Sequence, residues 1–158
     1  HFCRRMVGSP EDAEDLAQDS FVRVYRYLGR LRPDAKFSTV LFGMARNLTL
    51  NFLRDSGRRG RGLTDSLTRA DGSDCAIRDA NDRPDRAARL REIESLIEQG
   101  LARVSPEHRA ILLLREVQGL DYEAIAAAMG CRKGTVKSRL ARAREQLRAR
   151  IVELGGEV

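Results

Sequence analysis

The sequence contains no tryptophan, only three cysteines, and few aromatic residues, 5% in all. Cys3, Cys75 and Cys131 form no Cys-x-x-Cys pair, and their odd number argues against a disulfide framework. No apolar run approaches the roughly 20 residues that a membrane-spanning helix needs. No charged-then-apolar leader opens the sequence either. These absences predict a cytoplasmic chain with no membrane span, no bound metal ion and no cofactor.

Lysine is also scarce, with three among the 29 basic residues, so arginine supplies nearly all of the positive charge. A GC-rich genome explains most of the arginine excess, but the position of the charge is informative. From Arg132 to Arg150 there are eight basic residues and one acid, Glu145, so this stretch alone exceeds the net charge of +6. A localised basic stripe is typical of a surface that binds a polyanion. Five acids between Glu11 and Asp19 have the opposite bias and predict a surface that faces solvent or a basic protein.

The apolar residues recur with a helical period, and no strand-like alternation persists, so the sequence predicts an all-α fold. Serine followed by proline at Ser9 and again at Ser105 is typical of a helix start. Gly130 is placed to end a helix in the left-handed conformation. Leu16, Val24 and Leu28 are expected to face inward. Helices are predicted at about 10–28, 38–54, 85–102, 106–118, 122–129 and 132–152.

Residues 55–84 lose this periodicity and are rich in glycine, serine and aspartate, as in a flexible linker. The chain is therefore predicted to consist of two small helical domains, 1–54 and 85–158, joined by the linker 55–84. Each domain can bury only a modest core, and below about 60 residues stability is marginal. The basic cluster Arg58-Arg59-Gly60-Arg61 near the start of the linker either is solvated or contacts nucleic acid.

A short helix, a turn containing glycine and a longer basic helix form the pattern of a helix-turn-helix over residues 122–152. Ile125, Ala126, Met129, Val136 and Leu140 are expected to face the core. Arg132 and Lys133 are expected in the first turn of the basic helix, where the helix dipole disfavours cations and a bound phosphate would offset the cost. A solvated basic surface is the alternative. Steps of three and four leave one outer face, made by Lys133, Lys137, Ser138, Ala141 and Arg142.

Three segments resemble a known family. The run DYEAIAAAMGCRKGTVKSRLARAREQLR resembles region 4 of sigma-70-type transcription initiation factors of the extracytoplasmic-function (ECF) group. The runs DAEDLAQDSFVRVYRYLGRL and FSTVLFGMARNLTLNFLR resemble region 2 of the same group. Together they cover most of the chain in the order of the family. The resemblance implies a bacterial, non-catalytic subunit that binds core RNA polymerase and directs it to promoters.

The resemblance also implies roles for particular residues of region 4, which in this family reads the minus-35 promoter element as duplex DNA. Arg142 and Lys137 are the best candidates for base edges, because long donors reach O6 and N7 of guanine. Arg132, Lys133 and Thr135 are expected at phosphates. The full matching set is Arg115, Arg132, Lys133, Thr135, Lys137, Ser138, Ala141 and Arg142.

Region 2 of the family binds the clamp of the largest polymerase subunit and captures one unpaired strand of the minus-10 element. Asn47 matches the position that recognises a flipped base, and an amide suits a base edge because it donates and accepts at once. The minus-10 set is Lys36, Phe37, Arg46, Asn47 and Arg54, and the polymerase-binding set is Asp15, Gln18, Asp19, Val22, Tyr25 and Arg26.

The chain departs from the family at four points. Val40 stands where relatives often have tryptophan, Asn51 replaces a frequent aspartate, and Ala141 is small where some relatives carry an aromatic residue. The first helix of region 2 is expected to lie before His1 in a longer native chain. The resemblance further implies contact with the flap of the second-largest polymerase subunit, an anti-sigma factor as partner, and a nucleoid-associated location.

The sequence leaves two alternative function classes, a stand-alone regulator and an enzyme acting on nucleic acid. A stand-alone helix-turn-helix regulator would dimerise to read paired half-sites, but no heptad seam or ligand domain is evident. An enzyme acting on nucleic acid would need paired carboxylates beside a nucleophile, a metal cluster or a phosphate-binding glycine loop, and the sequence offers none of these patterns. An initiation factor should bind DNA weakly on its own, because two modules on a flexible linker need the polymerase to fix their spacing.

Overall fold

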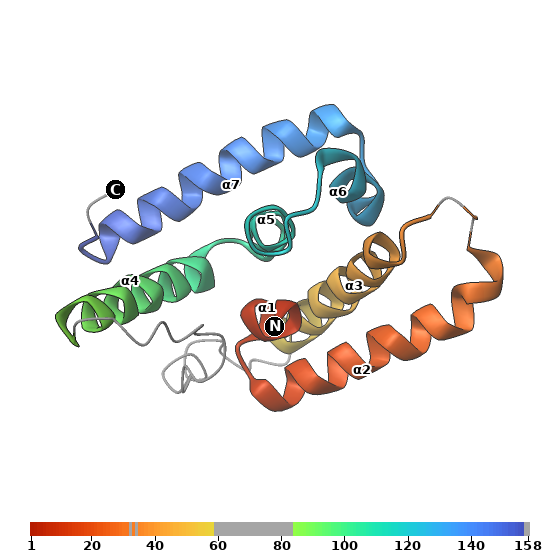
Figure 1. The fold of residues 1–158 in the computed structure, drawn as a ribbon, viewed down its shortest axis with the longest axis horizontal. Helices are drawn as coiled ribbons and strands as arrows, with labels where there is room; N and C mark the ends of the chain where they lie inside the picture. The colour runs from red at the N-terminus through yellow and green to blue at the C-terminus, as the bar shows by residue number, and fades with distance from the viewer. Residues whose placement is uncertain (32, 34, 59–83, 157–158) are drawn as a thin grey trace.

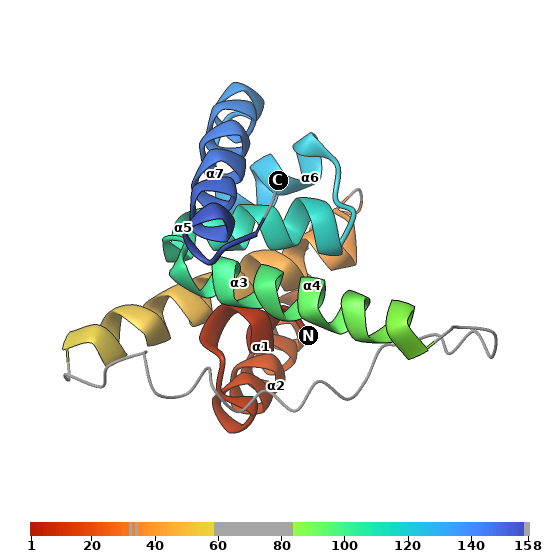
Figure 2. The same ribbon diagram turned by 90° about the vertical axis from the view of Figure 1, so that its left-hand side faces the viewer.

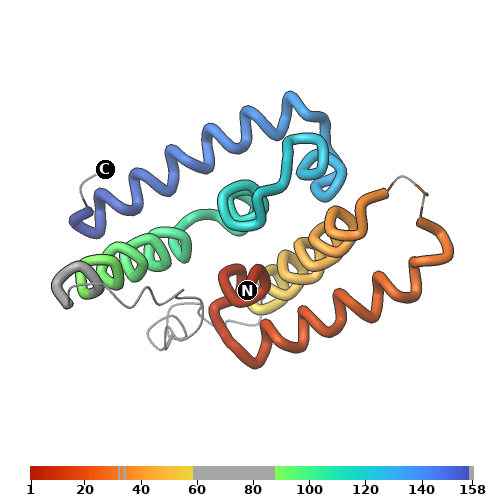
Figure 3. The backbone as a smooth tube through the Cα atoms, viewed as in Figure 1, coloured from red at the N-terminus to blue at the C-terminus, as the bar shows by residue number. Residues whose placement is uncertain are grey.

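The computed structural model describes residues 1–31, 33, 35–58 and 84–156, and within these residues the chain is helical with no strand, as predicted. Figure 1 shows the helices and Figure 3 the path of the chain through them. The first half contains α1 (Phe2–Val7), α2 (Pro10–Tyr27), the 3-10 helix η1 (Leu28–Arg30) and α3 (Phe37–Arg58). The second half contains α4 (Pro84–Arg103), α5 (Pro106–Leu112), the π-helical turn η3 (Leu113–Val117), α6 (Tyr122–Met129) and α7 (Lys133–Glu153).

Local sequence signals fix several helix ends. The hydroxyl of Ser9 accepts a hydrogen bond from the backbone N–H of Asp12 at 3.2 Å, and Pro10 follows as the first helical residue. The carboxylate of Asp121 accepts from the N–H of Ala124 at 2.7 Å and so caps α6. Gly130 ends α6 with a φ of 61°, which confirms its predicted left-handed conformation.

Three details differ from the expectation. No helix was predicted before Ser9, but the six residues of α1 form one, with Phe2 and Met6 buried. Leu28 was expected to face inward, but it is 45% exposed, because α2 ends one residue earlier and the chain turns away through η1. The helix predicted for 106–118 is interrupted, because α5 passes into a π-helical turn at Leu113.

The helices form two groups that lie against each other. In Figure 1, α7 runs along one edge above α4 and α5, and α2 runs along the opposite edge beside α3. The short helix α1 packs against both α2 and α3, and α6 packs against both α3 and α7. The view in Figure 2 shows α4 crossing the molecule above α1 and α2. Helix α6 therefore connects the basic helix α7 to the first half of the chain.

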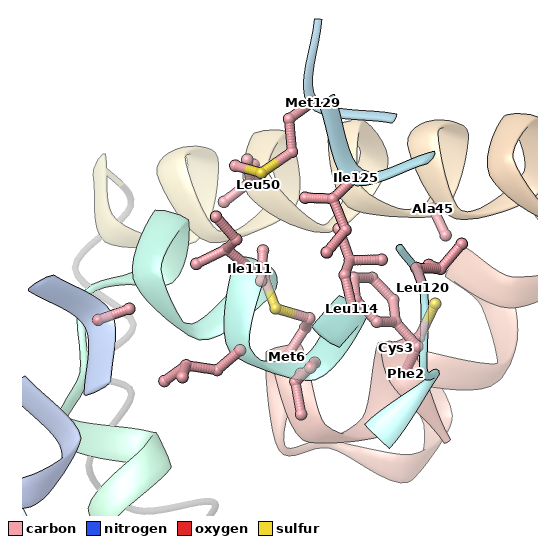
Figure 4. Packing of buried hydrophobic residues seen from close by; sticks show 14 of the residues in the cluster. Phe2, Cys3, Met6, Ala45, Leu50, Ile111, Leu114, Leu120, Ile125 and Met129 are labelled. Carbon is pink, nitrogen blue, oxygen red and sulfur yellow. The ribbon is translucent and has the colours of Figure 1, made fainter. Parts of the chain in front are cut away.

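Buried side chains of both halves form one hydrophobic cluster. Met6 of α1 is fully buried, as are Ile111 of α5 and Ile125 of α6. Figure 4 shows these residues converging with Ala45 and Leu114 between the helices. Two separate modest cores were expected, and the described helices share one instead. The domain boundaries 1–54, 55–84 and 85–158 stay a prediction, because residues 59–83 of the linker, with Arg59 and Arg61, lie outside the described residues.

The backbones of α3 and α6 approach each other closely at Gly43 of α3. A Cβ added there would lie 3.2 Å from the carbonyl oxygen of Ala128 and 3.4 Å from its Cα. A glycine inside a helix costs about 1 kcal/mol relative to alanine. Here the absence of a side chain lets α3 and α6 pack backbone to backbone. This close packing explains why a glycine is present inside α3 despite its cost.

Candidate nucleic-acid and polymerase interfaces

One face of α7 is exposed and basic, as the helical period predicts. Val136 and Leu140 are buried, with exposed fractions of 0% and 1%, and they hold the helix on the core. The opposite face carries the five residues that the helical period placed on one outer face, and all five are exposed: Lys133, Lys137, Ser138, Ala141 and Arg142. The described structure thus places these five residues together on one solvent-facing surface, which we call the α7 face.

The first turn of α7 concentrates positive charge. Arg132 occupies the N-cap position without a capping hydrogen bond from its side chain. Lys133 donates to Oε1 of Glu123 at 2.6 Å, and this hydrogen bond raises the pKa of Lys133. Thr135 is half-buried, and its carbonyl accepts from the hydroxyl of Ser138 at 3.1 Å. A carboxylate on α6 therefore already partners Lys133, one of the predicted phosphate contacts.

Arg115 reaches this region from the π-helical turn η3. Its Nη1 donates to the carbonyl of Leu120 at 2.9 Å, and its guanidinium lies 5.1 Å from the ring centroid of Tyr122. Arg115 and Lys133 line the same surface hollow, of about 380 Å³, with Asp121, Tyr122 and Glu123. The structure brings Arg115 beside the α7 face, but its guanidinium also stabilises the turn before α6.

The minus-10 candidates lie on α3 or just before it. Phe37 is 49% exposed, and Lys36, Asn47 and Arg54 are also exposed. Arg46 differs, because only 11% of its side chain is exposed and its Nη2 contacts Oε2 of Glu107. The Nη1 of Arg46 donates to Oδ1 of Asn47 at 2.9 Å.

Charged and apolar side chains share the outer surface of α2. Ala13, Leu16, Ser20 and Val24 are buried against the core. Tyr25 is 76% exposed, and Phe21, which the sequence analysis did not single out, is 55% exposed. Large apolar side chains exposed among acids are typical of a protein–protein contact. All of the predicted polymerase-binding residues are exposed: Asp15, Gln18, Asp19, Val22, Tyr25 and Arg26.

A buried arginine that the sequence does not single out joins the halves. Arg109 is only 5% exposed. Its guanidinium donates to the carbonyl of Met6 at 2.6 Å, to that of Leu101 at 2.8 Å, and to two more carbonyls at the end of α4. Burial lowers the pKa of Arg109, but an arginine keeps its proton in proteins. No pattern in the sequence distinguishes Arg109 from the surface arginines around it.

Two features are absent from the described ranges. No group of three or more histidine, cysteine, aspartate and glutamate side chains comes close enough there to hold a metal ion. Nor does any helix among the described residues have the length and apolarity needed to cross a bilayer.

Comparison with known protein families gives two matches. The family described as sigma-70 region 2 matches residues 1–59, and the one described as sigma-70, region 4 matches residues 94–147. The matches fall in the order that the resemblance predicted. The first includes the six residues of α1.

Named relatives agree with these matches. The RNA polymerase sigma-H factor of Pseudomonas aeruginosa is 39% identical over 148 residues, which span 90% of this chain and 75% of that protein. The ECF RNA polymerase sigma-E factor of Haemophilus influenzae is 33% identical over 148 residues, spanning 92% and 78%.

Solved structures are also similar. The sigma factor RpoE of Bartonella quintana, crystallised with the anti-sigma factor NepR, superposes with a TM-score of 0.63 at 25% identity, covering 95% of this chain and 87% of that one. CnrH, solved with the cytosolic domain of CnrY, has a TM-score of 0.62 at 24% identity, which shows the fold alone. These findings favour an initiation factor over a stand-alone regulator. The chain belongs to the sigma-70 family of RNA polymerase sigma factors, in its extracytoplasmic-function group, and is a transcription initiation factor.

Proposed function

We propose that the chain divides promoter recognition between two helices, with α7 reading the minus-35 element in the major groove and α3 capturing the melted minus-10 strand. The observation that carries the proposal is the α7 face, whose exposed donors Lys133, Lys137, Ser138 and Arg142 lie on a helix held against the core by Val136 and Leu140. A helix of this kind fits the major groove of B-form DNA.

Within the α7 face, long side chains differ in role from short ones. Lys137 and Arg142 are the candidates for base edges, and a bidentate contact from Arg142 to O6 and N7 of guanine gives base discrimination. Arg132, Lys133 and Thr135 lie at the start of the helix, where the positive dipole end and backbone N–H groups also favour phosphate. Ser138 and Ala141 are small enough to let the helix approach the bases. Arg115 contributes from η3 to the phosphate contacts.

On α3, we propose that exposed Asn47 recognises a flipped base through its amide. Phe37 offers a ring on which a base can stack, and Lys36, Arg46 and Arg54 attract the phosphates of a single strand. The arrangement along one helix suits an unpaired strand, which can follow the helix without the geometry of a duplex.

The remaining surfaces suit protein partners. We propose that the α2 surface around Tyr25 and Asp19 binds the clamp of the largest subunit of core RNA polymerase, and that the second half contacts the flap of the second-largest subunit. An anti-sigma factor is a further proposed partner, since RpoE of Bartonella quintana was crystallised with one. The chain acts without catalysis of its own, in the cytoplasm and at the nucleoid.

The proposal is tested by run-off transcription with core RNA polymerase and fragments of the source genome. Adding the purified chain should produce transcripts from a subset of fragments that share two short sequence motifs. Core polymerase alone and the chain alone serve as controls and should give none of these products. Absence of any chain-dependent transcript across the whole fragment library would contradict the proposal.

A further inference from the structure

Two cations on one flank of α7 already have carboxylate partners on the elements before it. Lys133, Lys137 and Arg144 are four and seven residues apart, and such steps stay on one side of a helix. Nζ of Lys133 lies 2.6 Å from Oε1 of Glu123 on α6, which Figure 1 shows beside the start of α7. Nη2 and Nε of Arg144 donate to Oε1 of Glu116 in η3, at 2.6 Å and 3.1 Å. The first and last cations of this row are therefore paired with acids.

The cations at the proposed reading positions differ from these two. Lys137 and Arg142 are exposed, and within the part of the chain that the structure describes their side chains form no ion pair. The paired side chains are also open to solvent, since between 50% and 76% of each of the four is exposed. DNA on the α7 face can therefore reach paired and unpaired cations alike, and the carboxylates are close enough to affect it.

A carboxylate beside a cation reduces the attraction of that cation for phosphate. Most of the attraction between protein cations and DNA comes from the release of counterions and does not depend on base sequence. Contacts to phosphates position a protein, whereas contacts to base edges carry the sequence information. An ammonium has three donors, so Lys133 can touch DNA while it keeps Glu123, but the pair as a whole adds little net charge.

The reduced charge matters most for binding in the wrong register. An unpaired cation at either end of the row would hold α7 on phosphates wherever the helix lies along the groove, including registers in which Arg142 meets no guanine. In the correct register the base contacts already fix the helix. Extra phosphate attraction would therefore favour the incorrect complexes more than the correct one.

We propose that Glu123 and Glu116 are specificity determinants of minus-35 recognition: they offset Lys133 and Arg144 and so lower the affinity of the chain for DNA of any sequence. The inference rests on the proposed reading of the minus-35 element by α7. Both carboxylates act through the cations that they pair with, so they are positioning residues and contact no base.

The first test measures binding of the free chain to a fluorescein-labelled duplex of shuffled sequence, about 20 base pairs long, by anisotropy between about 50 and 200 mM salt. The double variant Glu116→Gln with Glu123→Gln keeps the hydrogen-bond acceptors and removes both charges. It should bind about threefold to tenfold more tightly at the lowest salt, with a salt dependence steeper by about 1 for each released cation.

A matched control separates this effect from net charge. Glu92→Gln with Glu94→Gln, two exposed positions on α4, makes the same change of charge away from α7. The control should leave the slope of the salt dependence unchanged. An unchanged slope in the double variant as well, or weaker binding by it, would overturn the proposal.

A double-mutant cycle tests whether Glu123 acts through its partner. In a chain that carries Lys133→Gln, the further change Glu123→Gln should add almost nothing to the affinity for the shuffled duplex. An equal gain from Glu123→Gln with and without Lys133 would show that the carboxylate merely repels DNA, and would overturn the positioning role.

The last test measures discrimination by the chain bound to core polymerase. The probes are a promoter fragment recovered by run-off transcription and the same fragment with its minus-35 element shuffled. The ratio of the two affinities should fall about threefold or more in the double variant. An unchanged ratio would overturn the inference and leave the proposed function standing. A polymerase complex of the unaltered chain that prefers neither fragment would contradict the proposed function, and the inference would fall with it.

Discussion

At the scale of residues, the buried guanidinium of Arg109 links several helices. No pattern in the sequence indicates these contacts. It bonds carbonyls at the end of α4 and the carbonyl of Met6 in α1. These carbonyls lie at or near helix ends, where few backbone N–H groups are left to satisfy them. The carbonyl of Leu101 also accepts from the N–H of Val104 at 3.1 Å. One side chain therefore satisfies the ends of two helices that are about a hundred positions apart in the sequence.

Replacing Arg109 by methionine should lower the free energy of unfolding by about 2–4 kcal/mol, because buried carbonyls lose their donors. Urea denaturation followed by circular dichroism measures the change. Arg103→Met, at an exposed position of α4, is the matched control and should change the stability by less than about 0.5 kcal/mol. Two variants of similar stability would contradict the structural role of Arg109.

Local sequence patterns predict the exposure of some site residues but not of others. The exposed positions of Lys137 and Arg142 follow from the helical period, because Val136 and Leu140 must face the core. The burial of Arg46 does not follow from any local pattern, since it depends on Glu107, 61 positions away. Contacts of this kind depend on which helices pack against each other. The apolar period along a single helix does not show this.

At the scale of elements, the two glycines around the helix-turn-helix differ in what they do. Gly130 adopts the left-handed conformation at the end of α6, with a φ of 61°, whereas Gly134 lies in the first turn of α7 with ordinary helical backbone. A Cβ at either position would meet no atom within 4 Å. Any difference between alanine variants at these positions therefore reports on the backbone alone.

Gly130→Ala should destabilise the chain by about 1 kcal/mol, because an L-residue is strained in the left-handed region. Gly134→Ala should instead stabilise it by about 0.5 kcal/mol, since alanine loses less conformational entropy on folding. Thermal unfolding of the two variants beside the unaltered chain measures both. Stabilisation by Gly130→Ala would contradict the left-handed backbone conformation of Gly130 in the turn.

The cap of α6 makes stability depend on pH. The hydrogen bond from the N–H of Ala124 lowers the pKa of Asp121, with a smaller contribution from Lys36. Because the folded chain favours the charged carboxylate, the cap stabilises the fold above the ordinary pKa of aspartate. This stabilisation is lost as the pH falls through the lower pKa of the folded state.

Asp121→Asn tests the cap, because asparagine caps a helix without titrating. Urea unfolding at pH values from about 6 to 3 should show the stability of the unaltered chain falling relative to that of the variant. A stability difference that stays constant across this range would contradict the proposed titration of Asp121.

The order and type of the elements were largely predictable. Serine before proline, the capping aspartate and Gly130 set helix ends through local chemistry, so the bounds of α2 and α6 agree with the prediction closely. Helix α1 was missed, because six residues are too few to display a period and its stability comes from burial of Phe2 and Met6. The π-helical turn at Leu113 was missed for a similar reason, since no residue pattern marks it.

At the scale of the whole molecule, the shared core is the main difference from expectation. An amphipathic pattern shows which face of a helix is apolar, but it does not show which other helix covers that face. Two small helical domains could each have closed on themselves. Instead the apolar face of α6, with Ile125 and Met129, packs against α3 and joins the core of the first half.

The shared core has to be reconciled with the proposed division of promoter recognition between α3 and α7. In the free chain α3 and α6 lie in contact, whereas the two promoter elements are separate stretches of DNA. The polymerase therefore has to bind both halves and hold them at the spacing of the promoter. The account thus predicts that each helix reads its own element independently once the polymerase is bound.

The most direct measurement is run-off transcription from a randomised promoter library, with core polymerase and three forms of the chain: unaltered, Asn47→Ala and Arg142→Ala. Sequencing the transcribed templates gives the base preference at every position. Arg142→Ala should lose about 1–3 kcal/mol of discrimination at the minus-35 element and leave the minus-10 preference intact. Asn47→Ala should do the reverse. If both variants altered the same element, or neither altered any base preference, the division of recognition between α3 and α7 would be wrong.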